Sequence, residues 1–300
     1  MSFEDNFLRQ VDFSRSHARR DDERAIRSRI ELPPLIKTAH NRLKREVFSN
    51  QSYSIQAPEF SSIYGKENII ADMQKIATYR KQWEQQSSQE KNSKVLAEVL
   101  EGMILVNARE NGWFGDSVTM KTSLFDDVFN KTDMFTEWHE NTEGSRVLAM
   151  AVDITYGKTA LSKKLQDIKT EIDSDRLGTI RYFKDTRGDF MGTRNNIPRT
   201  VIGISPEHTL AIASLWMKGD SDALQTHTTQ RVLIEEMYVQ TKAMADYAHF
   251  HNHKNATRAY EDALASIEKL RQQKESISIA DQEPDTIAAE LITQTKAIFG

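Results

Sequence analysis

The segment from Leu124 to Lys158, LFDDVFNKTDMFTEWHENTEGSRVLAMAVDITYGK, decides the predicted fold of this chain. Residues 134–138 and 147–156 are rich in β-branched and aromatic side chains, which is typical of strands. The polar stretch 141–145 between them contains Gly144 and is typical of a turn. The segment therefore predicts two antiparallel strands that are neighbours in a sheet.

The predicted hairpin brings two aspartates together. If the turn is centred near Glu143, Asp133 falls opposite Asp153. Cross-strand partners have Cβ atoms roughly 4.5–5.5 Å apart, and two carboxylates at that separation repel unless a cation or a proton lies between them. Asp126 and Asp127 precede the first strand and are within reach of the same point. The hairpin therefore predicts a cluster of carboxylates.

Alternation along the second strand predicts which face of the sheet carries these acids. One face is bulky and apolar and is expected to pack into the core; it consists of Leu148, Met150, Val152 and Ile154. The other face has small residues followed by polar ones, as expected beneath a cleft; it consists of Val147, Ala149, Ala151, Asp153 and Thr155. An unpaired charge at the end of a buried strand is costly, so these acids are expected to hold a ligand.

The expected ligand is a divalent cation, Mg²⁺ or Mn²⁺. Both ions prefer oxygen ligands, and Mg²⁺ typically takes one or two carboxylates together with water and a phosphate. We expect Asp127, Asp133 and Asp153 to be the metal ligands. A bound divalent cation lowers the pKa of a water ligand and neutralises charge on a phosphoryl oxygen, so the expected chemistry is metal-assisted hydrolysis. The alternative is that these acids are ordinary turn and strand-end residues at the surface.

The rest of the chain predicts an α/β (α+β) core between two helical extensions. Residues 1–90 predict a polar N-terminal helical arm, residues 91–205 the core, and residues 206–300 a C-terminal helical region packed on the core. The predicted elements of the core, in order, are a helix over 94–109, strands over 117–123, 134–138 and 147–156, a helix over 159–176, a strand over 179–183, a polar connector over 184–199 and a strand over 200–205.

This order of helix, three strands, helix and two strands resembles the core of the PD-(D/E)xK nuclease-like superfamily, which has a restriction-endonuclease-like fold. The resemblance covers roughly residues 94–205. It implies that Asp133 is the aspartate of the second strand and that residues 153–155 occupy the acid-x-Lys position. It also implies that a glutamate of the first helix, Glu98 or Glu101, takes part in the site. We favour Glu101, because Gly102 beside it permits close approach of a backbone.

The same segment also resembles uncharacterised bacterial proteins that share a DD-x2-NG-x-D pattern, with Lys131 in place of the glycine. The chain departs from the superfamily at Thr155, which stands where the superfamily has a lysine that orients or activates the attacking water. Another lysine is then expected to take that role, and the candidates are Lys158, Lys163, Lys164 and Lys121. If none does, the resemblance implies a catalytically inactive nuclease-like fold.

Composition excludes several other classes of protein. The chain has no Cys, which excludes disulfide frameworks, thiolate metal sites and cysteine nucleophiles. Lys and Arg number 40 against 44 Asp and Glu, so there is no overall basic field. The N-terminus lacks a signal-peptide pattern and no apolar run could span a bilayer, so we expect a cytoplasmic protein without a membrane partner. The sequence does not predict an oligomeric state.

Three functions are consistent with these patterns. The first is a Mg²⁺- or Mn²⁺-dependent nuclease acting on DNA or RNA, in which Asp133, Asp153, Thr155, Glu101 and Lys158 form the catalytic site. The second is an inactive version of the same fold that binds nucleic acid or protein. The third is an interaction scaffold in which the C-terminal helices carry the function. Lys184, Arg187, Arg194 and Arg199 are the candidates for phosphate contacts.

Overall fold

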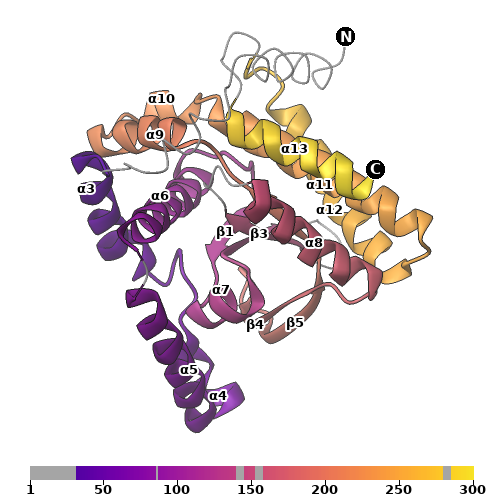
Figure 1. Ribbon diagram of the computed structural model, residues 1–300, viewed down its shortest axis with the longest axis horizontal. Helices are drawn as coiled ribbons and strands as arrows, with labels where there is room; N and C mark the ends of the chain where they lie inside the picture. The colour runs from indigo at the N-terminus through magenta and orange to yellow at the C-terminus, as the bar shows by residue number, and fades with distance from the viewer. Residues whose placement is uncertain (1–31, 86, 140–144, 153–157, 280–284) are drawn as a thin grey trace.

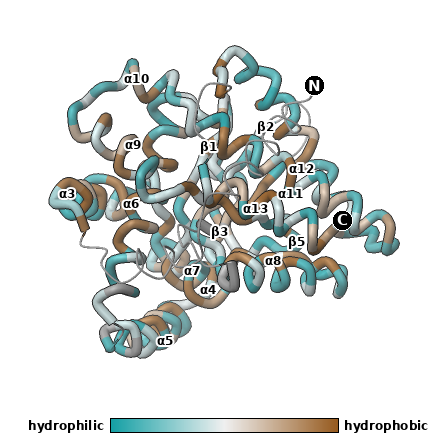
Figure 2. The backbone as a smooth tube through the Cα atoms, turned by 45° about the horizontal axis from the view of Figure 1, so that its top comes forward, coloured by the Kyte–Doolittle hydropathy of each residue, from teal (hydrophilic) through white to brown (hydrophobic). Residues whose placement is uncertain are grey.

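The computed structural model describes residues 32–85, 87–139, 145–152, 158–279 and 285–300. It is a mixed α/β structure in which helices surround a small central sheet (Figure 1). None of the helices in these ranges is both long enough and apolar enough to cross a membrane. Figure 2 shows hydrophobic and hydrophilic residues mixed along most helices, as expected for helices with one buried face.

The elements are as follows. The helical segments before the first strand are α3 (Pro34–Leu43), η1 (Lys44–Phe48), η2 (Ala57–Phe60), α4 (Ser61–Tyr64), α5 (Lys66–Glu84) and α6 (Ser88–Glu110). The middle of the chain contains β1 (Val118–Lys121), α7 (Leu124–Asn130), β2 (Met134–His139), β3 (Ser145–Val152), α8 (Lys158–Asp173), β4 (Gly178–Lys184), β5 (Met191–Ile197) and β6 (Arg199–Ile202). The C-terminal helices are α9 (Pro206–Lys218), α10 (Ser221–Gln225), α11 (Thr229–Phe250), α12 (Lys254–Gln273) and α13 (Thr286–Phe299).

The central sheet has four strands in the order β1-β2-β3-β6. β1, β2 and β3 are antiparallel neighbours, and β6 lies parallel to β3. The parallel pairing requires a long connection, and helix α8 lies within that connection. β4 and β5 form a separate two-stranded sheet that precedes β6 in the chain.

Both faces of the central sheet are buried. Met134, Leu148 and Met150 belong to a large core with α3, α6, α9, α11 and α12, as predicted for the bulky face of β3. The opposite face was expected to lie beneath a cleft. Instead, Phe135 and Ala149 pack there against apolar residues of the β4–β5 hairpin. That expectation was wrong because a second sheet covers this part of the strands.

The predicted register of the β2–β3 hairpin was also wrong. Met134 pairs with Met150 and Phe135 with Ala149, which is a shift of two residues from the predicted pairing of Asp133 with Asp153. Because side chains alternate with a period of two, the shift leaves every residue on its predicted face. Continuing the observed register by one residue places Ala151 opposite Asp133, whose amide donates to the carbonyl of Met150 at 3.1 Å.

The predicted connector over residues 184–199 contains strand β5, and the predicted strand β4 pairs with β5 rather than joining the central sheet. The sequence of β5, MGTRNNI, has few apolar residues, since much of this strand is exposed and its pattern does not indicate burial. Helix α7 was likewise not predicted. Ser123 caps it by accepting a hydrogen bond from the amide of Asp126.

Helix α7 ends at a residue with left-handed backbone geometry. Lys131 has φ of 53°, a conformation that glycine adopts readily and a side chain disfavours.

Helix α6 buries one apolar face in the core, which consists of Leu96, Val99, Leu100, Met103 and Ile104. Gly102 lies on this helix beside α3, and a Cβ atom there would lie 2.6 Å from the Cδ atoms of Leu43. The close approach that Gly102 permits is therefore packing of α3 on α6, rather than access of a ligand to Glu101.

Helix α11 carries a carboxyl group that is buried in the core. Glu236 of α11 accepts a hydrogen bond from the amide of Gly203 at 3.0 Å, and its other oxygen is buried without a partner. Burial holds the pKa of Glu236 well above its ordinary value of 4.5, despite that hydrogen bond. The folded protein therefore keeps a proton that the unfolded chain releases above about pH 4.5, so this group lowers stability as the pH rises.

Glu236→Gln is expected to raise Tm by a few degrees at pH 8 and to have no such effect at pH 4, where the carboxyl group is protonated in both states. Thermal denaturation at the two pH values measures this. Glu235→Gln is the control on the neighbouring residue: Glu235 accepts from Arg231 at 2.7 Å and Arg271 at 2.8 Å, so its loss is expected to lower Tm. An equal gain for Glu236→Gln at both pH values would contradict the assignment.

Candidate functional site

Three carboxylates surround a buried lysine where β1 ends and β2 begins. Lys121, the last residue of β1, forms an ion pair with Glu101 of α6. Asp127 lies in the first turn of α7, and Asp133 directly precedes β2. β1 and β2 are antiparallel, so the last residue of β1 and the first residue of β2 lie at the same end of the sheet. We call Glu101, Lys121, Asp127 and Asp133 the carboxylate–lysine cluster.

The buried cluster contains more acidic than basic side chains. Burial alone would lower the pKa of Lys121, but the charges of Glu101, Asp127 and Asp133 raise it, so the lysine stays protonated. Burial raises the pKa of Glu101 to about 7, against the opposing effect of Lys121. Three acids therefore share the buried Lys121, and the more distant Lys94 also acts on Asp127, so a proton or a bound cation would relieve the remaining repulsion among the acids.

Asp127 and Asp133 line the same pocket, and the two carboxyl groups are close enough to influence each other. Burial raises the pKa of Asp127, and the nearby charge of Glu101 raises it further, while Lys121 and Asp133 lower it. A metal ion held by both groups requires that they be deprotonated, so its binding would release any proton that they carry.

A pocket of about 210 Å³ opens beside these two aspartates. It is lined by Asp127, Lys131, Asp133, Lys164, Asp167, Ile168, Arg199 and Val201. Three basic residues thus lie at the edge of the carboxylate pair. Lys131 pairs with Asp167. Arg199 donates to the carbonyl of Lys131 at 2.8 Å and to Glu171 at 2.7 Å, so its guanidinium is held in place.

Asp127 and Asp133 are the two carboxylates beside this pocket that are candidates to hold a metal ion. Among the residues that the structure describes, no group of three or more His, Cys, Asp and Glu side chains could hold a metal ion. Asp127 and Asp133 both line the pocket, and Mg²⁺ typically takes one or two carboxylates alongside water and phosphate oxygens. The third expected ligand, Asp153, follows β3 directly in the sequence but lies outside the described residues.

The other predicted site residues divide into three groups. Asp153 and Thr155 lie outside the described residues, and so does the side chain of Lys158, the first residue of α8. Glu98, the alternative to Glu101, pairs with His40 of α3 instead of joining the cluster. Of the alternative lysines, Lys121 lies within the cluster and Lys164 lines the pocket.

Asp126 has a different role from its neighbour Asp127. Its carboxylate is fully buried and accepts from the amides of Arg181 at 2.7 Å and Tyr182 at 3.1 Å. The β4–β5 pairing is irregular between Ile180 and Phe183, which leaves these amides of β4 available. Asp126 therefore joins α7 to the hairpin and does not face the cluster, although the sequence suggested both aspartates for one site.

Of the four basic residues that the sequence suggested for phosphate contacts, only Arg199 lines the pocket beside the aspartates. Lys184 lines a different cavity, and the guanidinium of Arg194 lies over the ring of Phe183, 5.0 Å from its centroid. Sequence reasoning missed Asp167 and Glu171, which hold Lys131 and Arg199. Their spacing of four residues on a single face of α8 was the available signal.

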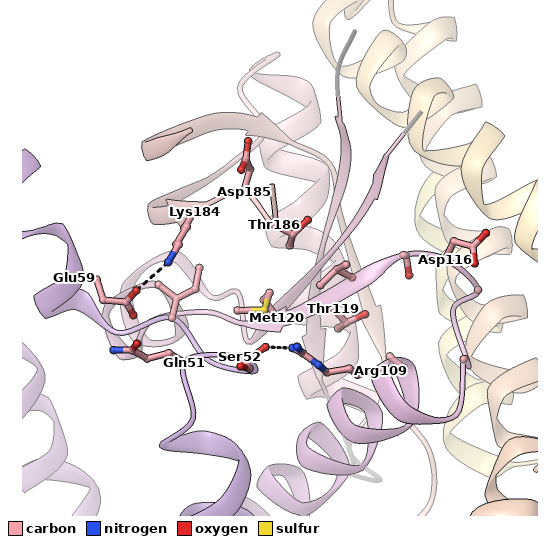
Figure 3. Close-up of a pocket in the computed structure, with 16 residues that line it drawn as sticks. Gln51, Ser52, Glu59, Arg109, Asp116, Thr119, Met120, Lys184, Asp185 and Thr186 are labelled. Carbon is pink, nitrogen blue, oxygen red and sulfur yellow. Dashed lines mark hydrogen bonds and ion pairs between the residues drawn. The ribbon is translucent and has the colours of Figure 1, made fainter. Parts of the chain in front are cut away.

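A larger cavity, of about 470 Å³, lies at the outer edge of β1 (Figure 3). In this cavity Lys184 pairs with Glu59 at 3.3 Å, and Arg109 donates to the carbonyl of Ser52. None of the carboxylate–lysine cluster lines it. We therefore place the candidate site at the smaller pocket, where buried groups with shifted pKa values meet basic side chains.

Comparison of the chain with protein-family models, with curated proteins and with solved structures finds no match.

Proposed function

We propose that this protein is a metal-dependent hydrolase that cleaves phosphodiester bonds of nucleic acid at the carboxylate–lysine cluster. The observation that carries the proposal is the pair Asp127 and Asp133, which line one pocket together with basic residues and whose charges both act on the buried Lys121. Buried carboxylates and a retained lysine beside a small pocket are typical of sites that hold a metal and a phosphate.

The connectivity supports the same proposal. The chain contains, in this order, α6, β1, β2, β3, α8 and β6, with α7 between β1 and β2 and the β4–β5 hairpin before β6. The strands of the central sheet lie in the order β1-β2-β3-β6. We propose that these elements form a PD-(D/E)xK-like core into which the β4–β5 hairpin is inserted before the last strand. Asp133 then stands at the start of the second strand, where the superfamily has its aspartate.

Asp127 and Asp133 would hold a Mg²⁺ or Mn²⁺ ion, with Asp153 as the further expected ligand. When bound, the ion would lower the pKa of a water and neutralise charge on a phosphoryl oxygen. Arg199 and Lys131 are placed to bind non-bridging phosphate oxygens at the pocket edge. Lys121 keeps its proton and pairs with Glu101 beside the two aspartates. We propose that Lys121 takes the place of the lysine that is absent at Thr155.

An inactive nuclease-like module that binds nucleic acid or protein is the second candidate. The observation that favours it is the ion pair of Lys121 with Glu101, because a lysine engaged in this way is less able to position a water.

The test is incubation of the protein with single- and double-stranded DNA and RNA in Mn²⁺ or Mg²⁺, together with titration calorimetry of Mn²⁺ binding. We expect wild type to cleave at least one substrate, and Asp133→Asn to lower the rate at least about 100-fold and to abolish Mn²⁺ binding. Asp116→Asn is the matched control, because Asp116 is exposed and lines the larger cavity.

Equal cleavage by wild type and Asp133→Asn would remove the cluster as the site. Binding of nucleic acid without cleavage in either metal would contradict the hydrolase and support the binding module.

A further inference from the structure

Aromatic rings form a half-exposed cluster where α5 meets α7. The rings of Tyr79 and Trp83 on α5 have centroids 5.1 Å apart, and Tyr79 lies 6.1 Å from Phe129 of α7. Tyr79 is 39% exposed and Phe129 is 41% exposed. We call Tyr79, Trp83 and Phe129 the aromatic platform. Helix α5 extends away from the rest of the molecule (Figure 1), so the platform lies at the foot of a projecting helix.

Residues of α5 outside the platform attach this helix to the rest of the molecule. The exposed sides of the platform rings are therefore not needed for packing. Asp72 accepts from Tyr182 of β4 at 2.8 Å and pairs with Arg181 at 3.0 Å, while Ile69 and Ile76 are buried. Ile70 and Met73 of the same helix are exposed, whereas Asp72 is buried.

A single lysine connects the platform to the carboxylate–lysine cluster. The ammonium of Lys94 lies over the ring of Trp83, 3.2 Å from its centroid. The ammonium of Lys94 is also 3.9 Å from Glu98 on the same helix, and the charges of Asp127 and Glu101 reach it, so Lys94 is within electrostatic range of both the aromatic rings and the proposed site. The side chain of Lys94 is 41% exposed, and the positive charge of Arg80 acts on it as well. Phe129 is two residues from Asp127 on the same helix.

Exposed aromatic faces next to cations recognise a ligand that carries both π-faces and negative charge. Unpaired bases stack on such rings while the phosphates meet lysine and arginine side chains. The bases of a duplex are already stacked on each other and present no free face, so a platform of this kind selects single strands. The charges and the rings of this surface together match a single-stranded nucleic acid.

We propose that the aromatic platform binds unpaired bases of a single-stranded DNA or RNA and leads the strand past Lys94 to Asp127 and Asp133. This inference rests on the proposed function, since it names the substrate class of the same site. In this arrangement the exposed rings bind the bases, and the basic side chains bind the phosphates of the nucleic acid.

The test measures binding without cleavage, by fluorescence anisotropy of a labelled oligothymidine of about 15 nucleotides and of a duplex of equal length in EDTA. Trp83→Leu and Phe129→Leu remove a π-face but keep an apolar side chain that helices accept. Phe250→Leu is the matched control, because Phe250 is 80% exposed at the end of α11, away from the platform. Circular dichroism verifies that each variant is folded.

We expect wild type to bind the single strand at least about tenfold more tightly than the duplex. Each platform variant is expected to weaken single-strand binding about tenfold, whereas Phe250→Leu leaves it unchanged. Wild-type affinity in both platform variants, or equal affinity of wild type for duplex and single strand, would overturn the inference even if the protein cleaves. Loss of single-strand binding in the variants without any cleavage by wild type would retain the platform and remove the hydrolase.

Discussion

Lys121→Met is expected to lower the free energy of unfolding by about 3–5 kcal/mol, because it leaves buried acids without their cation. Lys121 and Glu101 are both buried, and the charges of Asp127 and Asp133 also act on the lysine. Methionine fills a similar volume, so the loss reports the missing charge more than a cavity. Urea denaturation at pH 7, followed by circular dichroism, measures the change.

Two further variants separate this effect from a general loss of lysine. Lys184→Met removes a lysine that pairs with Glu59 at 3.3 Å and is 43% exposed, so its loss is expected to cost less than about 1 kcal/mol. Lys121→Met combined with Glu101→Gln is expected to recover part of the stability, because one of the stranded charges is removed. A cost for Lys121→Met no larger than that for Lys184→Met would show that the cluster is not charged as described.

Adjacent aspartates on α7 are expected to give opposite results. Asp126→Ala is expected to destabilise the protein by about 3–5 kcal/mol, because it leaves two buried amides of β4 without an acceptor and removes bonds from Ser123 and Asn130. Asp127→Asn is expected to change stability by less than about 1 kcal/mol, since burial already disfavours the charge of this carboxyl group.

The same pair separates stability from activity. Asp127→Asn is expected to lose Mn²⁺ binding and cleavage while remaining folded, and thermal denaturation together with calorimetry measures both properties on each variant. If Asp126→Ala retained wild-type stability, or if Asp127→Asn retained Mn²⁺ binding, the division of roles between the two residues would be wrong.

Features that depend on local periodicity were predictable from the sequence. The apolar face of α6 and the core face of β3 follow from spacings of 3.6 and 2 residues, and both agree with the burial of residues such as Leu100 and Leu148. Glu101 lies beside Lys121, whereas Glu98 pairs with His40, and the role of Glu101 in a site stays a prediction.

Features that depend on distant partners were not predictable. The register of β2 and β3 is set by turn geometry as well as by alternation, so a shift of two residues leaves the sequence pattern unchanged. Asp126 and Asp127 look alike in the sequence, and only the amides of Arg181 and Tyr182, more than fifty residues later, distinguish them. Likewise, β5 became recognisable as a strand only through its pairing with β4.

The hydrogen bonds from β4 to Asp126 have a mechanical consequence for the site. Two amides of one strand hold both oxygens of the carboxylate, and this contact fixes the rotation of the short helix α7 about its axis. The direction in which Asp127 points is fixed with it, because a single peptide bond joins the two residues. The β4–β5 hairpin, which lies outside the central sheet, therefore helps to set the position of Asp127 beside Asp133.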